Sequence, residues 1–134
     1  MHQVRRICLA SKPEELDRLA RFSEELTHTF LSNEEKKHQL MLVLSEGVTN
    51  AMVHGNSMDP QKEVCVTIHP EKDALRIVIR DQGEGFNPDT IPNPLEEQNL
   101  LKTGGRGIWL IRRYALHVQY KDGGSTLEVV FSLR

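Results

Sequence analysis

The chain has 134 residues, of which 38% are hydrophobic, 27% charged and 5% aromatic, as in one globular domain rather than a disordered chain. Seventeen Lys and Arg against nineteen Asp and Glu leave a formal net charge of -2, which excludes a global positive field for nucleic acid or an anionic membrane. The longest apolar runs, such as residues 40–44, are far shorter than the roughly 20 residues that span a bilayer, and residues 1–6 do not lead into a signal-peptide apolar region. We therefore expect one cytoplasmic domain over residues 1–134, with no direct contact to nucleic acid or membrane.

The two cysteines, Cys8 and Cys65, have neither a C-x-x-C spacing nor an adjacent histidine pair. Disulfides are rare in cytosolic proteins. We therefore expect both thiols to be reduced and to act as small buried hydrophobic side chains.

The start of the chain predicts a strand followed by a helix. Residues 4–9 are the strand candidate, after which Ser11 caps and Pro13 opens a helix that ends near Thr29. The apolar residues of this helix recur at helical spacing: Leu16, Leu19, Ala20, Phe22 and Leu26.

Asn33, followed by two glutamates, predicts the start of a second helix. We expect this helix to end at His54, with Gly55 in the C′ position that favours a left-handed glycine. Its predicted buried face consists of Leu40, Val43, Leu44, Gly47, Val48 and Ala51.

The second half of the chain predicts two hairpins around a long loop and a short helix. Residues 64–68 and 75–79 alternate apolar with polar side chains and are joined by a turn at 70–73. The stretch 82–106 has no sustained period, and loops of that length are usually binding loops or lids. A helix over 107–114 and a hairpin of strands 116–120 and 125–131, turning at 122–124, complete a two-layer α/β sandwich.

Three polar residues recur one helical turn apart on the second predicted helix: Glu46, Asn50 and His54. An amide oxygen suits magnesium, and a carboxylate can orient or deprotonate a hydroxyl, so this row is a candidate for phosphate chemistry. The alternative is a solvated helix edge on which His54 interacts with the negative helix end.

A D-x-G-x-G pattern, made by Asp81, Gly83 and Gly85, directly follows the second strand of the first hairpin. The glycines let the backbone turn sharply and let a flat ligand approach closely, while Asp81 can accept a hydrogen bond from an exocyclic amine. A simple turn is the alternative interpretation.

A glycine-rich run comes immediately before the short helix and consists of Thr103, Gly104, Gly105, Arg106 and Gly107. Backbone N–H groups at a helix N-terminus form an anion site, to which Thr103 or Arg106 can add. It is not a Walker A loop, because no Gly-Lys-Ser/Thr follows, and an ordinary loop is the alternative.

The order of E-x-x-x-N on a long helix, D-x-G-x-G after a strand and G-G-x-G before a helix resembles the nucleotide-binding domain of gyrase-type ATPases, heat-shock chaperone ATPases, mismatch-repair ATPases and histidine kinases. The short length and the stretch 46–55 look most like the anti-sigma factor serine/threonine kinases of bacterial partner-switching systems. The resemblance covers nearly the whole chain. It implies a Bergerat-type α/β fold, a two-layer sandwich of a mixed, mostly antiparallel sheet with helices on one face.

The resemblance also implies roles for the candidate residues, with ATP and Mg²⁺ as cofactors. Glu46 would be the general base, Asn50 would carry the magnesium, and Asp81 would read the amino group of adenine in a pocket shaped by Gly83 and Gly85. Residues 87–106 would form a lid over the phosphates, which the glycine-rich run would contact through Thr103, Gly104, Gly105, Arg106 and Gly107.

The partners implied by the resemblance are an anti-anti-sigma antagonist, phosphorylated on serine or threonine, and a sigma factor; we also expect a homodimer. The alternative function is a non-catalytic, nucleotide-gated module that sequesters a regulatory protein. Gly47 departs from the family pattern, since alanine is more usual there, and we expect it to allow close packing against the sheet.

Overall fold

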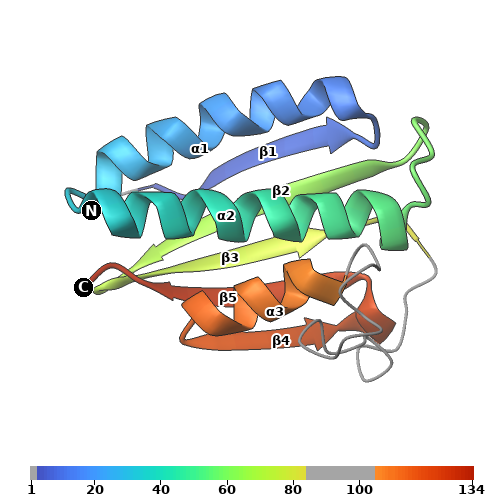
Figure 1. The fold of residues 1–134 in the computed structure, drawn as a ribbon. Helices are drawn as coiled ribbons and strands as arrows, with labels where there is room; N and C mark the ends of the chain where they lie inside the picture. Colours follow the sequence, from blue (N-terminus) through green and yellow to red (C-terminus); the bar gives the residue numbers. More distant parts are fainter. Residues whose placement is uncertain (1–2, 84–104) are drawn as a thin grey trace.

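A five-stranded sheet and three α-helices form two layers in this computed structural model, which describes residues 3–83 and 105–134. The helices lie on one face of the sheet (Figure 1), and within the described ranges none is long and apolar enough to cross a bilayer. The strand order is β1-β2-β3-β5-β4, and all four pairings of the described strands are antiparallel. The predicted two-layer α/β fold is therefore confirmed, with an antiparallel rather than a mixed sheet. The elements are β1 (Arg5–Ala10), α1 (Leu16–Phe30), α2 (Glu34–Asn50), β2 (Glu63–Glu71), β3 (Ala74–Arg80), α3 (Gly105–Tyr114), β4 (His117–Lys121) and β5 (Thr126–Ser132).

The first two helices differ in how they begin. Asn33 precedes α2 as predicted, and its Oδ1 accepts a hydrogen bond from the Lys36 N–H at 2.9 Å. Ser11 is not the predicted cap, because its hydroxyl donates to the Lys62 carbonyl at 2.8 Å, while the short 3-10 helix begins after Lys12 without a side-chain cap. Ser11 therefore ties the end of β1 to the start of β2.

The predicted helix end at His54, with Gly55 in the C′ position, is wrong. α2 passes into one π-helical turn, Ala51–Gly55, in which the Asn56 N–H donates to the Ala51 carbonyl at 2.9 Å. Left-handed backbone comes later, at Ser57 and Met58, with φ of 53° and 55°. A positive φ is therefore not what requires glycine at position 55.

β2 and β3 form the predicted hairpin with a tighter turn than the sequence pattern indicates. β2 continues to Glu71, so the turn consists of Lys72 and Asp73, with φ of 60° at Asp73. Pro70 is tolerated inside β2 because the pairing with β1 stops at Ile68, so the missing N–H interrupts no ladder there.

α2 packs directly on the sheet. Its predicted apolar face is confirmed, since all six residues are buried: Leu40, Val43, Leu44, Gly47, Val48 and Ala51. The helix and the sheet are in tight contact at Gly47, where a Cβ would lie 2.5 Å from Cδ1 of Ile79 in β3. The expected close packing at Gly47 is therefore confirmed.

The prediction of two reduced cysteines is wrong. Cys8 and Cys65 stand opposite each other in the register of β1 and β2 and form a disulfide. Their 57-residue separation carries no local signal, because only the strand register brings the two sulfur atoms together. Their strand neighbours Leu9 and Val64 are fully buried under the helices, so the disulfide lies on the opposite face of the sheet.

Candidate functional site

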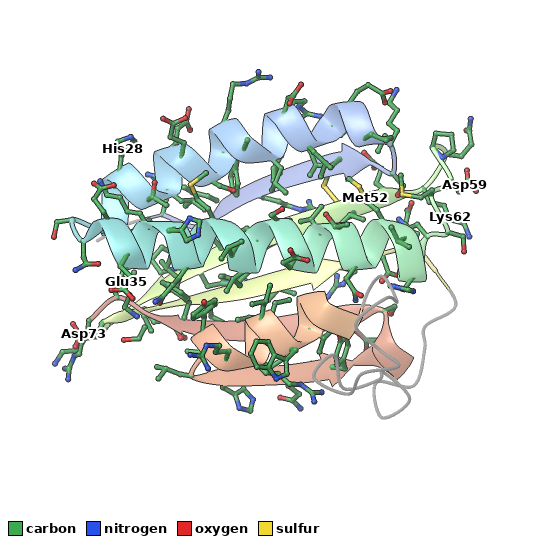
Figure 2. The ribbon with its side chains drawn as sticks, in the orientation of Figure 1. His28, Glu35, Met52, Asp59, Lys62 and Asp73 are labelled. Carbon is green, nitrogen blue, oxygen red and sulfur yellow. A yellow bond between two sulfur atoms is a disulfide. The ribbon has the colours of Figure 1, made fainter. Side chains whose placement is uncertain are left out.

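Asp81 lies immediately after β3, buried with 7% of its surface exposed. Its N–H donates to the Ser125 carbonyl at 2.9 Å, which continues the pairing with β5, and its Oδ1 accepts from the Gly83 N–H at 2.8 Å. Burial raises the pKa of this carboxyl above its ordinary value, against the Gly83 hydrogen bond and the positive charge of Lys62, which lower it. Lys62 lies at the end of the molecule where β3 finishes (Figure 2). Because Asp81 is largely removed from water, its carboxylate is stabilised by any hydrogen-bond donor that reaches it.

Two glycines allow the end of the π turn to reach this carboxylate. A Cβ on Gly55 would collide with the Asp81 carboxylate, and a Cβ on Gly83 would overlap the Gly55 carbonyl. The contact explains Gly55, which needs no positive φ, and it shows a steric requirement at Gly83. The helix that carries Glu46 and Asn50 is thereby joined to the loop that follows β3.

Asn56 is hydrogen-bonded to the loop that follows β3, and sequence analysis did not single it out. Its buried side chain donates to Ser11 Oγ at 2.9 Å and to the Glu63 carbonyl at 3.0 Å, and its Oδ1 accepts from the Gln82 N–H at 2.8 Å. One amide therefore fixes the ends of β1, β3 and the start of β2. Its place in a polar turn between predicted elements offered no signal of this role.

Glu46 faces the start of α3. A Cβ on Gly107 would lie 2.8 Å from Glu46 Oε2, so the helix approaches the carboxylate at a position without a side chain. Glu46 itself is half-buried. The structure thus brings together two residues that the sequence analysis placed in separate motifs, the first in E-x-x-x-N and the second in the glycine-rich run.

Asn50, one turn further along α2, is buried with 7% exposure. The hydroxyl of Tyr120 from β4 is close enough for the Asn50 side chain and Arg112 to lower its pKa and for Asp81 to raise it. Burial is the largest influence on Tyr120 and raises the pKa of its hydroxyl, which therefore stays neutral. Sequence analysis missed Tyr120; the available signal was a tyrosine on the inward side of an alternating strand.

The remaining predicted site residues lie in the π turn, at the start of α3 or outside the described residues. His54 is exposed, because the π turn takes it out of the helical row of Glu46 and Asn50. Gly105 and Arg106 belong to the first turn of α3. Residues 87–104 of the predicted lid, with the candidates Thr103 and Gly104, lie outside the described residues, as does Gly85.

The described site is the polar end of a two-layer α/β domain, where α2, α3 and the end of β3 meet. Residues 9–131 match the family model described as the histidine kinase-like ATPase domain. This match covers more than half of the chain, which therefore belongs to that family.

Curated relatives give a more specific similarity. An anti-sigma F factor of Bacillus cytotoxicus is 31% identical over 87 residues, which cover 63% of this chain and 60% of the relative. A serine-protein kinase RsbW of Staphylococcus epidermidis is 33% identical over 99 residues, covering 66% and 61%. An anti-sigma F factor of Anoxybacillus flavithermus is 29% identical over 97 residues, covering 69% and 66%. The chain thus spans about three-fifths of the length of the first two relatives.

Proposed function

We propose that this protein is an ATP- and magnesium-dependent serine/threonine protein kinase that acts as an anti-sigma factor. It would phosphorylate a small anti-anti-sigma antagonist and sequester a sigma factor. The observation that carries the proposal is the placement of Glu46 against Gly107 at the start of α3, on the same helix as the buried Asn50. Family membership implies ATP binding, and the names of the relatives support the kinase and anti-sigma roles.

Asp81 is the proposed reader of the adenine base. Its buried carboxylate accepts a hydrogen bond from the exocyclic amine of adenine, whereas guanine presents an oxygen at that edge and is disfavoured. Gly83 and Gly85 would shape the base pocket. The burial of Asp81 supports this role, because a buried carboxylate is stabilised by a hydrogen-bond donor such as the adenine amine.

Glu46 is the proposed general base. The acceptor hydroxyl forms a new bond to the γ-phosphorus, the bond to the oxygen bridging the β- and γ-phosphates breaks, and ADP leaves while the hydroxyl proton passes to Glu46. Phosphoryl transfer requires mainly positioning and charge neutralisation, so no covalent intermediate on the protein is needed. Thr103, Gly104, Gly105, Arg106 and Gly107 would contribute donors toward the phosphates.

Magnesium fits this site only together with the nucleotide. No group of three or more His, Cys, Asp or Glu side chains in the described residues is arranged to hold a metal ion. Asn50 offers one buried amide oxygen, and Mg²⁺ commonly takes one or two protein oxygens together with phosphates and water. When bound, the ion would neutralise charge on the phosphates; Asn50 would hold it, and Tyr120 would orient the amide.

The proposed partners are an antagonist with an acceptor serine or threonine, a sigma factor and a second copy of this chain, in the cytoplasm. α1 is the element we propose for a homodimer or partner contact, because Arg21 is exposed on it and Arg18, paired with Glu15 at 2.7 Å, is half-exposed.

The deciding experiment is transfer of labelled γ-phosphate from Mg·ATP into proteins of the host lysate. Wild type is compared with Glu46→Gln and with Glu35→Gln, a matched control at an exposed position of the same helix. We expect serine or threonine label, lowered about 10²- to 10⁴-fold by Glu46→Gln and unchanged by the control. ATP affinity should stay within a few-fold in all three proteins.

Two outcomes would contradict the proposal. Full transfer by Glu46→Gln would remove Glu46 as the base. Absence of label in wild type, alongside measurable ATP binding, would instead support the nucleotide-gated module that sequesters a partner without transferring phosphate.

A further inference from the structure

The face of the sheet opposite the helices carries a polar groove of about 380 Å³ that the proposed kinase chemistry does not use. The strand register defines it: Arg6, Thr67 and Val78 form one row across β1, β2 and β3. Arg76 and Arg80 flank Val78 on β3, each two residues away and on the same face. Three arginines therefore surround a floor of Thr67 and Val78, with Cα atoms about 7 to 10 Å from Val78 by ordinary strand spacing.

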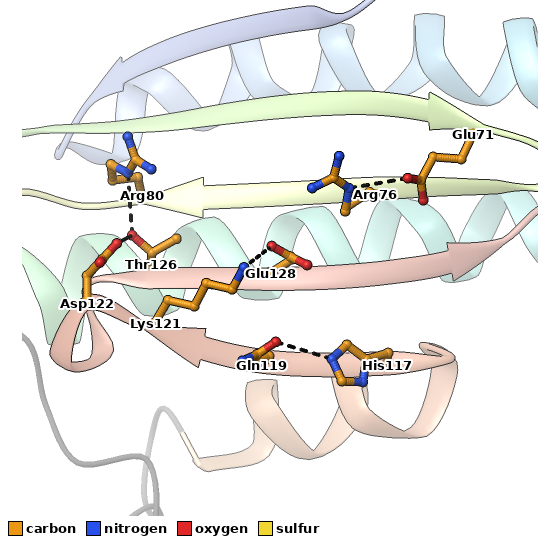
Figure 3. A network of polar contacts seen from close by, with 9 residues as sticks. All are labelled: Glu71, Arg76, Arg80, His117, Gln119, Lys121, Asp122, Thr126 and Glu128. Atoms are coloured by element: carbon orange, nitrogen blue, oxygen red, sulfur yellow. Dashed lines mark hydrogen bonds and ion pairs between the residues drawn. The ribbon is translucent and has the colours of Figure 1, made fainter.

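The carboxylates on this face are already engaged (Figure 3). Glu128 pairs with Lys121 at 2.8 Å, which lowers the Glu128 pKa, and Glu71 lies 3.4 Å from Arg76 Nε. Asp122 accepts from the Thr126 hydroxyl at 2.9 Å. These contacts leave the arginines with more positive charge than the local acids neutralise.

The three arginines have unmet capacity for anions within the described part of the chain. Arg6 is exposed with no ion pair there, and Arg80 makes one weak contact, from Nε to Thr126 Oγ1 at 3.4 Å. Arg76 Nε is buried and pairs with the Glu71 carboxylate at 3.4 Å, but this contact lacks hydrogen-bond geometry. Carboxylates match the forked geometry of a guanidinium, so these weakly held arginines favour further carboxylates as partners.

We propose that this groove docks an acidic segment of a partner protein, with carboxylates at Arg6, Arg76 and Arg80 and an apolar side chain over Val78. Glu128 and Asp122 line the same groove, and a continuous phosphate backbone would meet them with like charge. Among the described residues, His69 is the one aromatic side chain that lines it and could stack on bases. The mixed pattern therefore fits a peptide with spaced carboxylates. The site lies on the other face of the sheet from the nucleotide site and does not depend on it.

Fluorescence anisotropy of a fluorescein-labelled glutamate-glycine peptide at low ionic strength tests the docking. We expect wild type to bind it, to ignore a matched lysine-glycine peptide, and to release it as salt rises. Arg6→Gln with Arg80→Gln should weaken binding at least fivefold. The control with the same charge change, Lys12→Gln with Lys72→Gln, alters two exposed residues elsewhere and should change binding less than twofold.

Arg6 is exposed, and its side chain makes no hydrogen bond or ion pair with the described residues, so Arg6→Glu keeps the test valid if the double variant unfolds. This substitution should abolish binding. Thermal unfolding establishes that each variant is folded. Failure of wild type to bind the acidic peptide would overturn the proposal, as would unchanged binding by Arg6→Glu. Equal or tighter binding of an oligothymidylate would assign the groove to nucleic acid instead. A change of sedimentation coefficient in Arg6→Glu would assign it to a second copy of the chain.

Discussion

The two faces of the sheet use polar residues in opposite ways. On the covered face Asn50 and Asp81 lie at one end, where each is only 7% exposed between α2, α3 and the end of β3. On the open face they are spread along the strands as partly exposed ion pairs, such as Lys121 with Glu128, whose side chains are 44% and 14% exposed. Buried polar groups are costly and surface ion pairs contribute little, so the first set demands an explanation by function while the second can vary.

Gly83→Ala, on the covered face, should have the largest effect on ATP binding. The new methyl group would overlap the Gly55 carbonyl, and backbone on both sides must move. We expect loss of detectable ATP binding and a free energy of unfolding lower by about 1–3 kcal/mol. ATP titration and urea unfolding measure the two effects.

Gly123→Ala is the matched control for Gly83→Ala. A Cβ there meets no atom within 4 Å, so its φ of 70° is the only penalty, about 1 kcal/mol. ATP binding should be unchanged. Equal effects of the two substitutions on ATP binding would show that the contact between Gly55 and Gly83 does not shape the site.

On the open face, the Cys8–Cys65 disulfide should matter for stability and not for the nucleotide. Replacing both cysteines by serine removes a link between residues 57 apart, which typically lowers the free energy of unfolding by about 2–4 kcal/mol. ATP affinity should remain within twofold. Urea unfolding with and without reductant measures the change in wild type, and the double variant serves as the control that reductant cannot affect. Two reactive thiols in the native, unreduced protein would contradict the pairing.

Asp81→Asn separates stability from function on the covered face. The nucleotide proposal predicts loss of the adenine preference and of the stabilisation by Mg·ATP, about 2.7 kcal/mol at a hundredfold excess over Kd. Without nucleotide, Asp81→Asn should instead stabilise the protein at neutral pH. The folded pKa of Asp81 is raised, so the folded state binds more protons than the unfolded state between 3.8 and the folded pKa, and stability falls as pH rises through that window.

Above that window the uncharged asparagine avoids the burial cost, so Asp81→Asn should unfold at higher urea than wild type at neutral pH. The gain should shrink on acidification toward pH 4. Urea unfolding at several pH values checks the trend. A variant that is less stable than wild type at neutral pH, or that retains its adenine preference, would count against the buried carboxylate as the base reader.

The sequence predicted the features that leave a local pattern and missed those that depend on contacts between distant segments. Apolar periodicity located the helices and strands to within a few residues, because burial of Leu40, Leu44 and Val48 on one helix face leaves a local pattern. Motif spacing singled out Glu46, Asn50 and Asp81 as site residues, and their roles remain predictions. Sequence analysis did not predict the disulfide or the roles of Asn56 and Tyr120, because each depends on strand register or on partners from distant segments. The π turn escaped as well, since no local rule separates it from an ordinary helix end.

Tyr120→Phe should give the smallest effect and tests whether a residue found only in the structure serves the site. Removing the hydroxyl takes away the group that we propose orients the Asn50 amide, which should cost about 0.5–1.5 kcal/mol and leave the packing intact. We expect the magnesium concentration for half-maximal phosphoryl transfer to rise a few-fold, with a smaller change in ATP affinity. Tyr114→Phe, at a half-buried position on α3, is the control. If both variants shift the magnesium dependence equally, Tyr120 contributes to packing alone; a shift confined to Tyr120→Phe would identify it as the residue that orients Asn50.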